Sequence, residues 1–104
     1  MRSILLAAAL ATLPPTAFAA VLHVTIVDYA FVPALITVRP GDAVVWTNTD
    51  TVPHTVAALD GSFGSGALPP GGRFRQVFSH PGRFTYRCGI HPEMQGTVVV
   101  SPPG

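Results

Sequence analysis

Short runs of alternating apolar and polar residues follow one another along most of the chain. This period of two is typical of strands with one buried face, and it recurs in seven segments: 21–27, 35–39, 43–48, 54–58, 73–79, 83–88 and 97–101. Turn residues such as Pro40, Gly41 and Asp42 separate the segments, and none has the 3.6-residue period of a long helix. The pattern predicts an all-β domain of about seven to eight short strands, folded as an antiparallel sandwich or a small barrel.

The alternation in segment 83–88 directs a cysteine toward the interior. Phe84, Tyr86 and Cys88 fall on one face of this strand, and two arginines and a threonine fall on the other. Cys88 is therefore expected at the end of a strand with its side chain pointing inward. Phe74 and Phe78 alternate in the same way within segment 73–79, and Trp46 lies in segment 43–48, so we expect all three in the core.

A long connection rich in glycine and proline joins the fourth and fifth predicted strands. Residues 60–72 hold five glycines and two prolines, a composition that prevents regular structure and permits tight reversals. Gly64, Ser65 and Gly66 resemble part of a phosphate-binding loop, but such a loop needs a helix after it, and Pro69 and Pro70 oppose one. We therefore interpret the segment as a connection within the sandwich.

Residues 1–19 have the pattern of a secretory signal peptide. Arg2 precedes an apolar run over 4–13, and residues 17–19 read Ala-Phe-Ala, a small-x-small cleavage sequence. Cleavage there gives a domain over 20–104; cleavage after Ala20 is the alternative and would make His23 the third residue. The apolar run is much shorter than the roughly 20 residues of a membrane span. The sequence predicts a periplasmic or otherwise secreted, soluble protein without a stable membrane anchor.

Composition narrows the classes of partner. Removal of residues 1–19 leaves 85 of 104 residues, enough for one small domain whose core is only marginally sufficient without a bound metal. This domain has five arginines against five acidic residues, and it lacks lysine and any basic run. Nucleic-acid binding is therefore disfavoured. We expect a monomer, and its single cysteine excludes an internal disulfide.

Three soft-metal ligands lie within nine residues near the C-terminal end. The stretch CGIHPEMQG places His91 three positions and Met94 six positions after Cys88. His54 opens a predicted strand, and a sandwich can bring that end of the sheet to the cysteine loop. Two imidazoles and a thiolate, with a thioether as a weak fourth ligand, make the trigonal arrangement of blue-copper sites. The spacing predicts a single copper ion that changes by one electron.

Competing kinds of site use fewer of these four residues. Structural zinc would need more cysteine or histidine pairs and does not use methionine, a cysteine protease would need an orienting third group and a cleft, and haem attachment would need a second cysteine. Cys88 as an inert buried thiol and Met94 as a core gap-filler remain open on the sequence alone. His23 and His80 are the competing histidine ligands.

The sequence resembles the cupredoxins, and among them the amicyanin and plastocyanin group. The resemblance covers nearly all of residues 20–104, through the stretches TVRPGD, VWTNTD, PHTV and PGRFTYRC. Its most specific part is Cys88-x-x-His91-Pro92-x-Met94, which is similar to the short ligand loop of amicyanins. The resemblance implies a Greek-key β-sandwich with one type 1 copper ion near one end.

The resemblance also implies a role for each site residue. His54, Cys88 and His91 match the strong copper ligands, and Met94 matches the distant axial ligand. Redox partners are expected to dock near His91, within an apolar patch for which the local candidates are Pro53, Ile90 and Pro92.

Two positions depart from the family pattern. Thr55 follows the first histidine ligand, where family members commonly have an asparagine that ties this strand to the cysteine loop; threonine can still form a hydrogen bond, with shorter reach. Ile90 stands where amicyanins often have a proline. We expect these changes to affect the redox potential and the rigidity of the loop rather than copper binding.

These features together predict a one-electron carrier between redox partners, not an enzyme. A periplasmic protein that binds, buffers or delivers copper is the alternative. The closed set of four ligands favours the carrier, because a delivery protein benefits from an exchangeable site.

Overall fold

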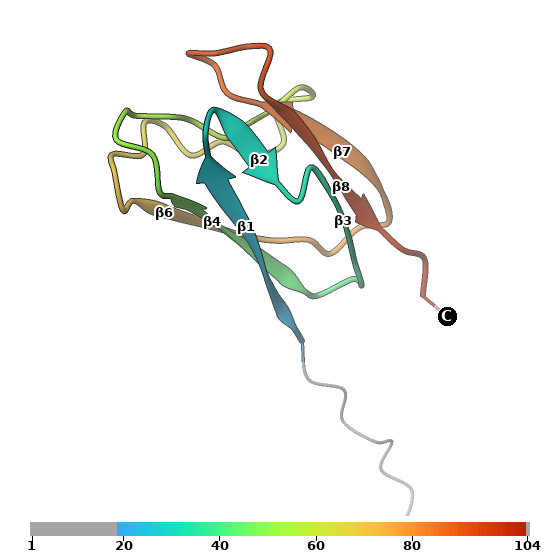
Figure 1. Ribbon diagram of the computed structural model, residues 1–104. Helices are drawn as coiled ribbons and strands as arrows, with labels where there is room; N and C mark the ends of the chain where they lie inside the picture. The colour runs from blue at the N-terminus through green and yellow to red at the C-terminus, as the bar shows by residue number, and fades with distance from the viewer. Residues whose placement is uncertain (1–18, 104) are drawn as a thin grey trace, which may run out of the picture.

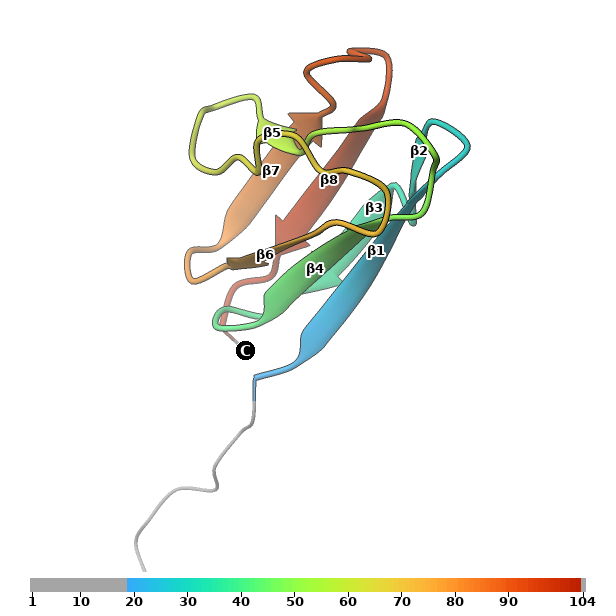
Figure 2. The same ribbon diagram turned by 90° about the vertical axis from the view of Figure 1, so that its left-hand side faces the viewer.

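Two four-stranded sheets pack face to face in the computed structural model, which describes residues 19–103 (Figures 1 and 2). The first sheet has the order β2-β1-β4-β6, and the second has the order β3-β8-β7-β5. The bounds are β1 Val21–Val27, β2 Ala30–Val32, β3 Leu35–Val38, β4 Ala43–Asn48, β5 Ala57–Ala58, β6 Arg73–Val77, β7 Gly82–Arg87 and β8 Gln95–Val100. The predicted all-β sandwich is confirmed. All but the last residue of the predicted signal peptide lies outside the described residues.

Two of the strand pairs are parallel, contrary to the expected antiparallel arrangement. β1 pairs in parallel with β4, and β3 pairs in parallel with β8. The reason is that β3 belongs to the other sheet, so the chain crosses the sandwich before β4 returns beside β1 in the same direction. The remaining pairs are antiparallel.

The predicted strands correspond closely to the observed ones, with two differences. The alternation does not predict β2, because three residues are too few to show a period. Of the predicted strand over 54–58, only Ala57–Ala58 pairs as a strand, and His54 instead forms an isolated bridge with Leu68. The glycine-rich connection therefore holds the backbone of His54, which supports its interpretation as a connection within the sandwich.

Aromatic rings fill the space between the two sheets. Trp46 is fully buried and lies within 6.4 Å, centroid to centroid, of Phe63, Phe78 and Tyr86. The prediction of Trp46 and Phe78 as core residues is confirmed, whereas Phe74 is only partly buried and packs against this core. Within residues 19–103, no helix is long and apolar enough to cross a membrane.

The phenol of Tyr86 sets a size limit at Gly96 on the neighbouring strand. Tyr86 and Gly96 are register partners in β7 and β8, and a Cβ atom added at Gly96 would overlap the Tyr86 hydroxyl. Burial raises the pKa of Tyr86 to about 12, against a smaller opposing effect of Trp46. Its hydroxyl oxygen has no hydrogen-bond partner among residues 19–103. Glycine at position 96 is therefore required by packing.

We predict that Gly96→Ala lowers the free energy of unfolding by about 1–3 kcal/mol, the usual cost of overpacking a core. Gly64→Ala is the matched control, because a Cβ atom there would meet only the Val56 carbonyl oxygen, at 3.8 Å. Urea denaturation of both variants checks this. Equal stability of the two would show that Tyr86 can move aside.

Candidate metal centre

The sequence-predicted histidine and cysteine ligands meet at one end of the sandwich. The loop from β7 to β8 carries Cys88 and His91, and Figure 1 shows it at the opposite end from the C-terminus. His54 approaches from the segment before β5. One ligand atom each from His54, Cys88 and His91 lies within 4.8 Å of the other two. Folding thus brings together residues that are 34 positions apart in the sequence.

Cys88 is a buried thiol whose surroundings favour ionisation. It follows the last residue of β7 and is fully buried, as the alternation predicts. Burial alone would raise the pKa of Cys88, but the Thr55 backbone N–H, the His54 side chain and the His91 and Ile90 backbones outweigh it and lower this pKa to about 6. The thiolate is the form that binds metal, so these hydrogen bonds favour the form of Cys88 that a metal site needs.

Thr55 joins the His54 segment to the cysteine loop. Its backbone N–H donates to the Cys88 sulfur at 3.3 Å, and its hydroxyl accepts a hydrogen bond from the Gly89 N–H at 2.7 Å. The expectation that threonine can still form a hydrogen bond here is confirmed. The backbone of Met94 closes the other side of the loop, since its carbonyl accepts from the Cys88 N–H and its N–H donates to the His91 carbonyl.

Asp50 fixes the orientation of His54. Its carboxylate lies 2.8 Å from His54 Nε2. The Tyr29 backbone N–H is the main cause of a lowered pKa of Asp50, with smaller contributions from Asp28 and His54 and an opposing one from partial burial. This contact engages Nε2 and leaves Nδ1 as the nitrogen that faces Cys88, 3.8 Å from its sulfur, so Nδ1 is the atom that would bind a metal. In the sequence, Asp50 is recognisable only as part of a polar corner.

A buried amide shapes the corner that contains Asp50. Asn48 is fully buried, and its side-chain NH₂ donates to the Val52 and Leu68 carbonyls, both at 2.9 Å. Its side-chain oxygen accepts from the Asp50 N–H at 3.0 Å. The turn between β4 and His54 is therefore held from the inside, which places both the carboxylate and the imidazole.

His91 and Met94 lie on the outer and inner sides of the same loop. The Nδ1 atom of His91 is 3.7 Å from the Cys88 sulfur, and its ring is partly exposed. Met94 is buried, with 3% of its surface exposed. The loop thus turns one predicted ligand toward solvent and the other toward the core. Pro53, Ile90 and Pro92, the predicted patch around His91, are all exposed.

The spacing of these atoms fits a single bound metal ion. Bonds of about 2.0 Å to nitrogen and 2.3 Å to sulfur are usual for a first-row metal such as zinc, and at a trigonal angle they separate the two ligand atoms by about 3.7 Å. The observed separations from the Cys88 sulfur are 3.7 and 3.8 Å. A mixed set of imidazole nitrogen and thiolate sulfur suits copper.

The competing histidines lie elsewhere. His23 is an exposed residue of β1 opposite Val45, and His80 is exposed in the turn before β7. Neither belongs to the cluster of potential metal ligands found among residues 19–103.

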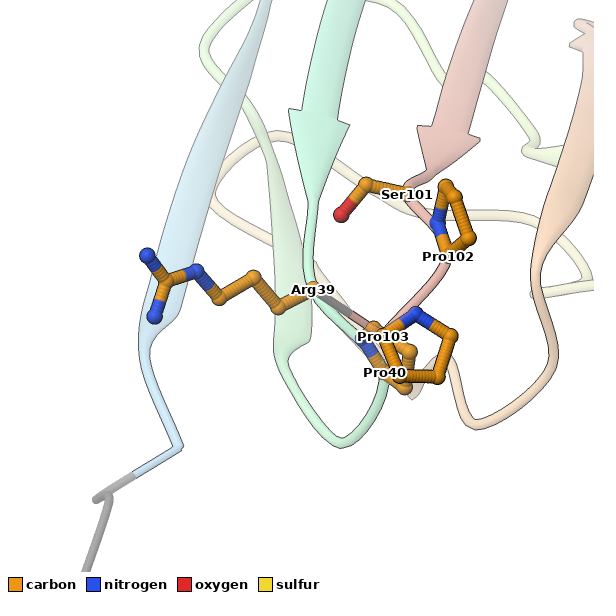
Figure 3. A pocket seen from close by; sticks show the side chains of 5 residues that line it. All are labelled: Arg39, Pro40, Ser101, Pro102 and Pro103. Carbon is orange, nitrogen blue, oxygen red and sulfur yellow. The ribbon is translucent and has the colours of Figure 1, made fainter.

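A surface pocket of about 500 Å³ lies beside the C-terminal end of β8, away from these ligands. Its lining residues are Arg39, Pro40, Ser101, Pro102 and Pro103 (Figure 3). In Figure 3 the Arg39 guanidinium extends away from the three prolines. The Ser101 hydroxyl donates to the Val38 carbonyl at 3.1 Å and is part of the strand end. The pocket lining therefore offers little polar chemistry.

Two imidazoles and a cysteine sulfur converge at one end of this β-sandwich, and the same loop carries the buried Met94, an arrangement typical of a type 1 copper protein. Comparison with known proteins agrees: the model of the cupredoxin-like domain matches residues 2–100, and the chain belongs to this family.

Amicyanins are among its relatives. The chain is 31% identical to amicyanin-alpha of Methylorubrum extorquens over 96% of this chain and 99% of that protein. It is 38% identical to amicyanin of Paracoccus denitrificans over 61% of this chain, and that match spans about half, 52%, of the relative.

Solved structures show the same fold. A purple cupredoxin from Nitrosopumilus maritimus superposes with a TM-score of 0.71 at 31% identity, over 77% of this chain and 99% of that one. A copper-containing nitrite reductase from Thermus scotoductus gives a TM-score of 0.74 at 28% identity, over 80% of this chain but only 23% of that one. The chain is an amicyanin-like cupredoxin, and it corresponds to a minor part of the reductase.

We predict that Thr55→Val weakens metal binding by about 10- to 100-fold, the usual effect of removing a residue that supports a ligand. The Gly89 N–H loses its acceptor in this variant, while the backbone N–H to Cys88 remains. Thr55→Ser keeps a hydroxyl and is the matched control. Competition with a copper chelator measures both, and equal affinity of Thr55→Val and the parent protein would contradict the role of this hydroxyl.

Proposed function

We propose that this protein is a soluble, exported one-electron carrier whose copper ion is bound by His54, Cys88, His91 and Met94. The observation that carries the proposal is the near-equal separation of the two imidazole nitrogens from the Cys88 sulfur, 3.7 and 3.8 Å. Asp50 orients the His54 imidazole, and backbone hydrogen bonds with Met94 hold the loop that carries Cys88 and His91. A site that is already shaped for the metal changes little when an electron is gained or lost.

Each residue has a distinct part in the proposal. Copper, when bound, supplies a one-electron couple between Cu(I) and Cu(II). Cys88 provides the thiolate, His54 provides an imidazole fixed by Asp50, and Met94 provides a weak axial thioether from the core side. His91 provides the second imidazole at the surface, and it is the ligand nearest to a docked partner.

We propose that redox partners dock around His91. Pro53, Ile90 and Pro92 surround this end of the molecule with exposed apolar side chains, and Ile90 has 52% of its surface exposed. The equal numbers of arginines and acidic residues in 20–104 favour docking that does not depend on strong charge steering. A monomer presents this face without obstruction.

The start of β1 supports processing after Ala19. Both backbone polar groups of Ala20 form hydrogen bonds. Its carbonyl accepts from the Ala43 N–H at 2.9 Å, and its N–H donates to the Asp42 carboxylate at 2.8 Å. Cleavage before Ala20 would leave a charged amine at that carboxylate. We therefore propose that the mature domain begins with this residue.

We propose a carrier rather than an enzyme because the four side chains close the coordination of the metal. Catalytic metal sites keep a position open for water or substrate. The likeness to nitrite reductase covers only 23% of that chain, so it does not support assigning the activity of the whole reductase to this domain.

Copper delivery is the second candidate, and the partial exposure of His91 is the observation that favours it. A ligand on an exposed loop can leave the metal and admit a receiving protein. Rapid transfer of copper to a chelator would support delivery, whereas slow release with fast electron exchange supports the carrier.

We predict that the copper-loaded protein has strong visible absorption from thiolate-to-copper charge transfer and gives reversible one-electron voltammetry. Cys88→Ser should abolish the colour and leave the apoprotein folded, because strands on both sides anchor the loop. Visible spectroscopy and circular dichroism check this. A colourless Cu(II) form of the parent protein would contradict the proposal.

We predict that Met94→Gln retains copper and lowers the midpoint potential, because a harder oxygen ligand favours Cu(II) over Cu(I). Voltammetry of the variant beside the parent protein measures the shift. If neither the potential nor the visible spectrum changes, Met94 is not the axial ligand.

A further inference from the structure

The turn between β1 and β2 has an unusual backbone for its sequence. Asp28 and Tyr29 form the two-residue loop of this hairpin, and both have positive φ, at 52° and 58°. Turns of this kind favour Asn-Gly or Asp-Gly, because glycine adopts positive φ without steric cost. A bulky residue in this conformation is uncommon and is found where something else requires it. The turn itself therefore does not account for a tyrosine at position 29.

The turn is tied directly to the metal centre through one carboxylate. Asp50 accepts a hydrogen bond from the Asp28 N–H at 2.7 Å and another from the Tyr29 N–H at 3.0 Å. The same carboxylate contacts His54 Nε2 at 2.8 Å. Asp50 thus fixes the turn and the first imidazole together, so the position of Tyr29 is set relative to the ligands.

The ring of Tyr29 packs edge-on against both imidazoles. Its centroid lies 5.2 Å from that of His54 at an interplanar angle of 89°, and 4.9 Å from that of His91 at 82°. These distances and angles are those of favourable T-shaped aromatic pairs. About half of the Tyr29 surface, 51%, stays exposed, so burial alone does not explain a tyrosine here.

His91 is the ligand that needs this support. His54 is held by Asp50, but within residues 19–103 the His91 ring has no hydrogen-bonding side chain near it other than Cys88. It also belongs to a loop with exposed residues on both sides. Its ring contacts are with the rings of Tyr29, 4.9 Å away, and His54, 5.0 Å away, so these are the contacts available to restrict rotation of the His91 imidazole.

We propose that Tyr29 is a positioning residue of the copper centre. Its ring, set in place by the Asp28–Tyr29 turn and Asp50, holds the His91 imidazole in the orientation that directs Nδ1 at the metal. This inference rests on the proposed copper-binding function. This role accounts for a tyrosine at a position whose backbone conformation suits glycine.

The test compares Tyr29→Gly with Tyr29→Phe in the full domain. Tyr29→Gly loses the aromatic contacts of the ring but relieves the cost of positive φ, so the apoprotein should stay close to the parent in thermal unfolding. Its copper should nevertheless be released to a chelator about 10-fold faster or more, with a changed visible and electron paramagnetic resonance spectrum. Tyr29→Phe keeps the ring and should match the parent protein in both respects.

If the parent protein, Tyr29→Gly and Tyr29→Phe release copper at the same rate and have the same spectra, the proposal is overturned. The same holds if Tyr29→Gly loses copper only in proportion to a loss of apoprotein stability, which would indicate a structural role. Should Tyr29→Gly fail to fold, Tyr29→Asn tolerates positive φ, lacks the ring and takes its place with the same expected result. Failure of the proposed function is distinguishable, because the parent protein itself would then lack the thiolate-to-copper band.

Discussion

The hydrogen bond from the Thr55 backbone to the Cys88 sulfur is the contact on which the metal centre depends. It joins two segments that are 33 residues apart and brings the His54 imidazole to the thiol. It also helps to reverse the effect of burial on ionisation, since the pKa of Cys88 falls to about 6 in a fully buried position. The same contact therefore supports both the ionisation of Cys88 and the placement of its sulfur beside two imidazole nitrogens, as a metal ligand requires.

A single carboxylate relates the surface of the centre to its interior. Asp50 bonds the His54 imidazole on one side and the strained Asp28–Tyr29 turn on the other. Strain of this kind persists only where the surroundings fix it firmly. The buried amide of Asn48 provides part of that support by holding the Asp50 backbone. We thus attribute the orientation of both imidazoles to Asn48 and Asp50, two polar side chains of this corner.

Much of the fold was predictable from the sequence, because the period of two marks each long strand and places Trp46 and Cys88 inside. The pairing of the strands was harder to predict. The parallel neighbours of β1 and β3 depend on where the chain crosses the sandwich, which local alternation does not encode. The histidine and cysteine cluster was predictable from residue type and spacing. Asp50 and Tyr29 were not, because a carboxylate in a polar corner and a tyrosine in a short turn carry no signal until folding brings them to His54.

We infer that the polypeptide itself sets the spacing of the ligands. High-resolution crystal structures of the apoprotein and of the copper-loaded protein test it most directly. We predict that the distances from the Cys88 sulfur to the His54 and His91 Nδ1 atoms stay close to 3.8 and 3.7 Å in both. An apoprotein in which the His91 ring points away from Cys88, or in which the Thr55 contact with Cys88 is broken, would contradict this inference.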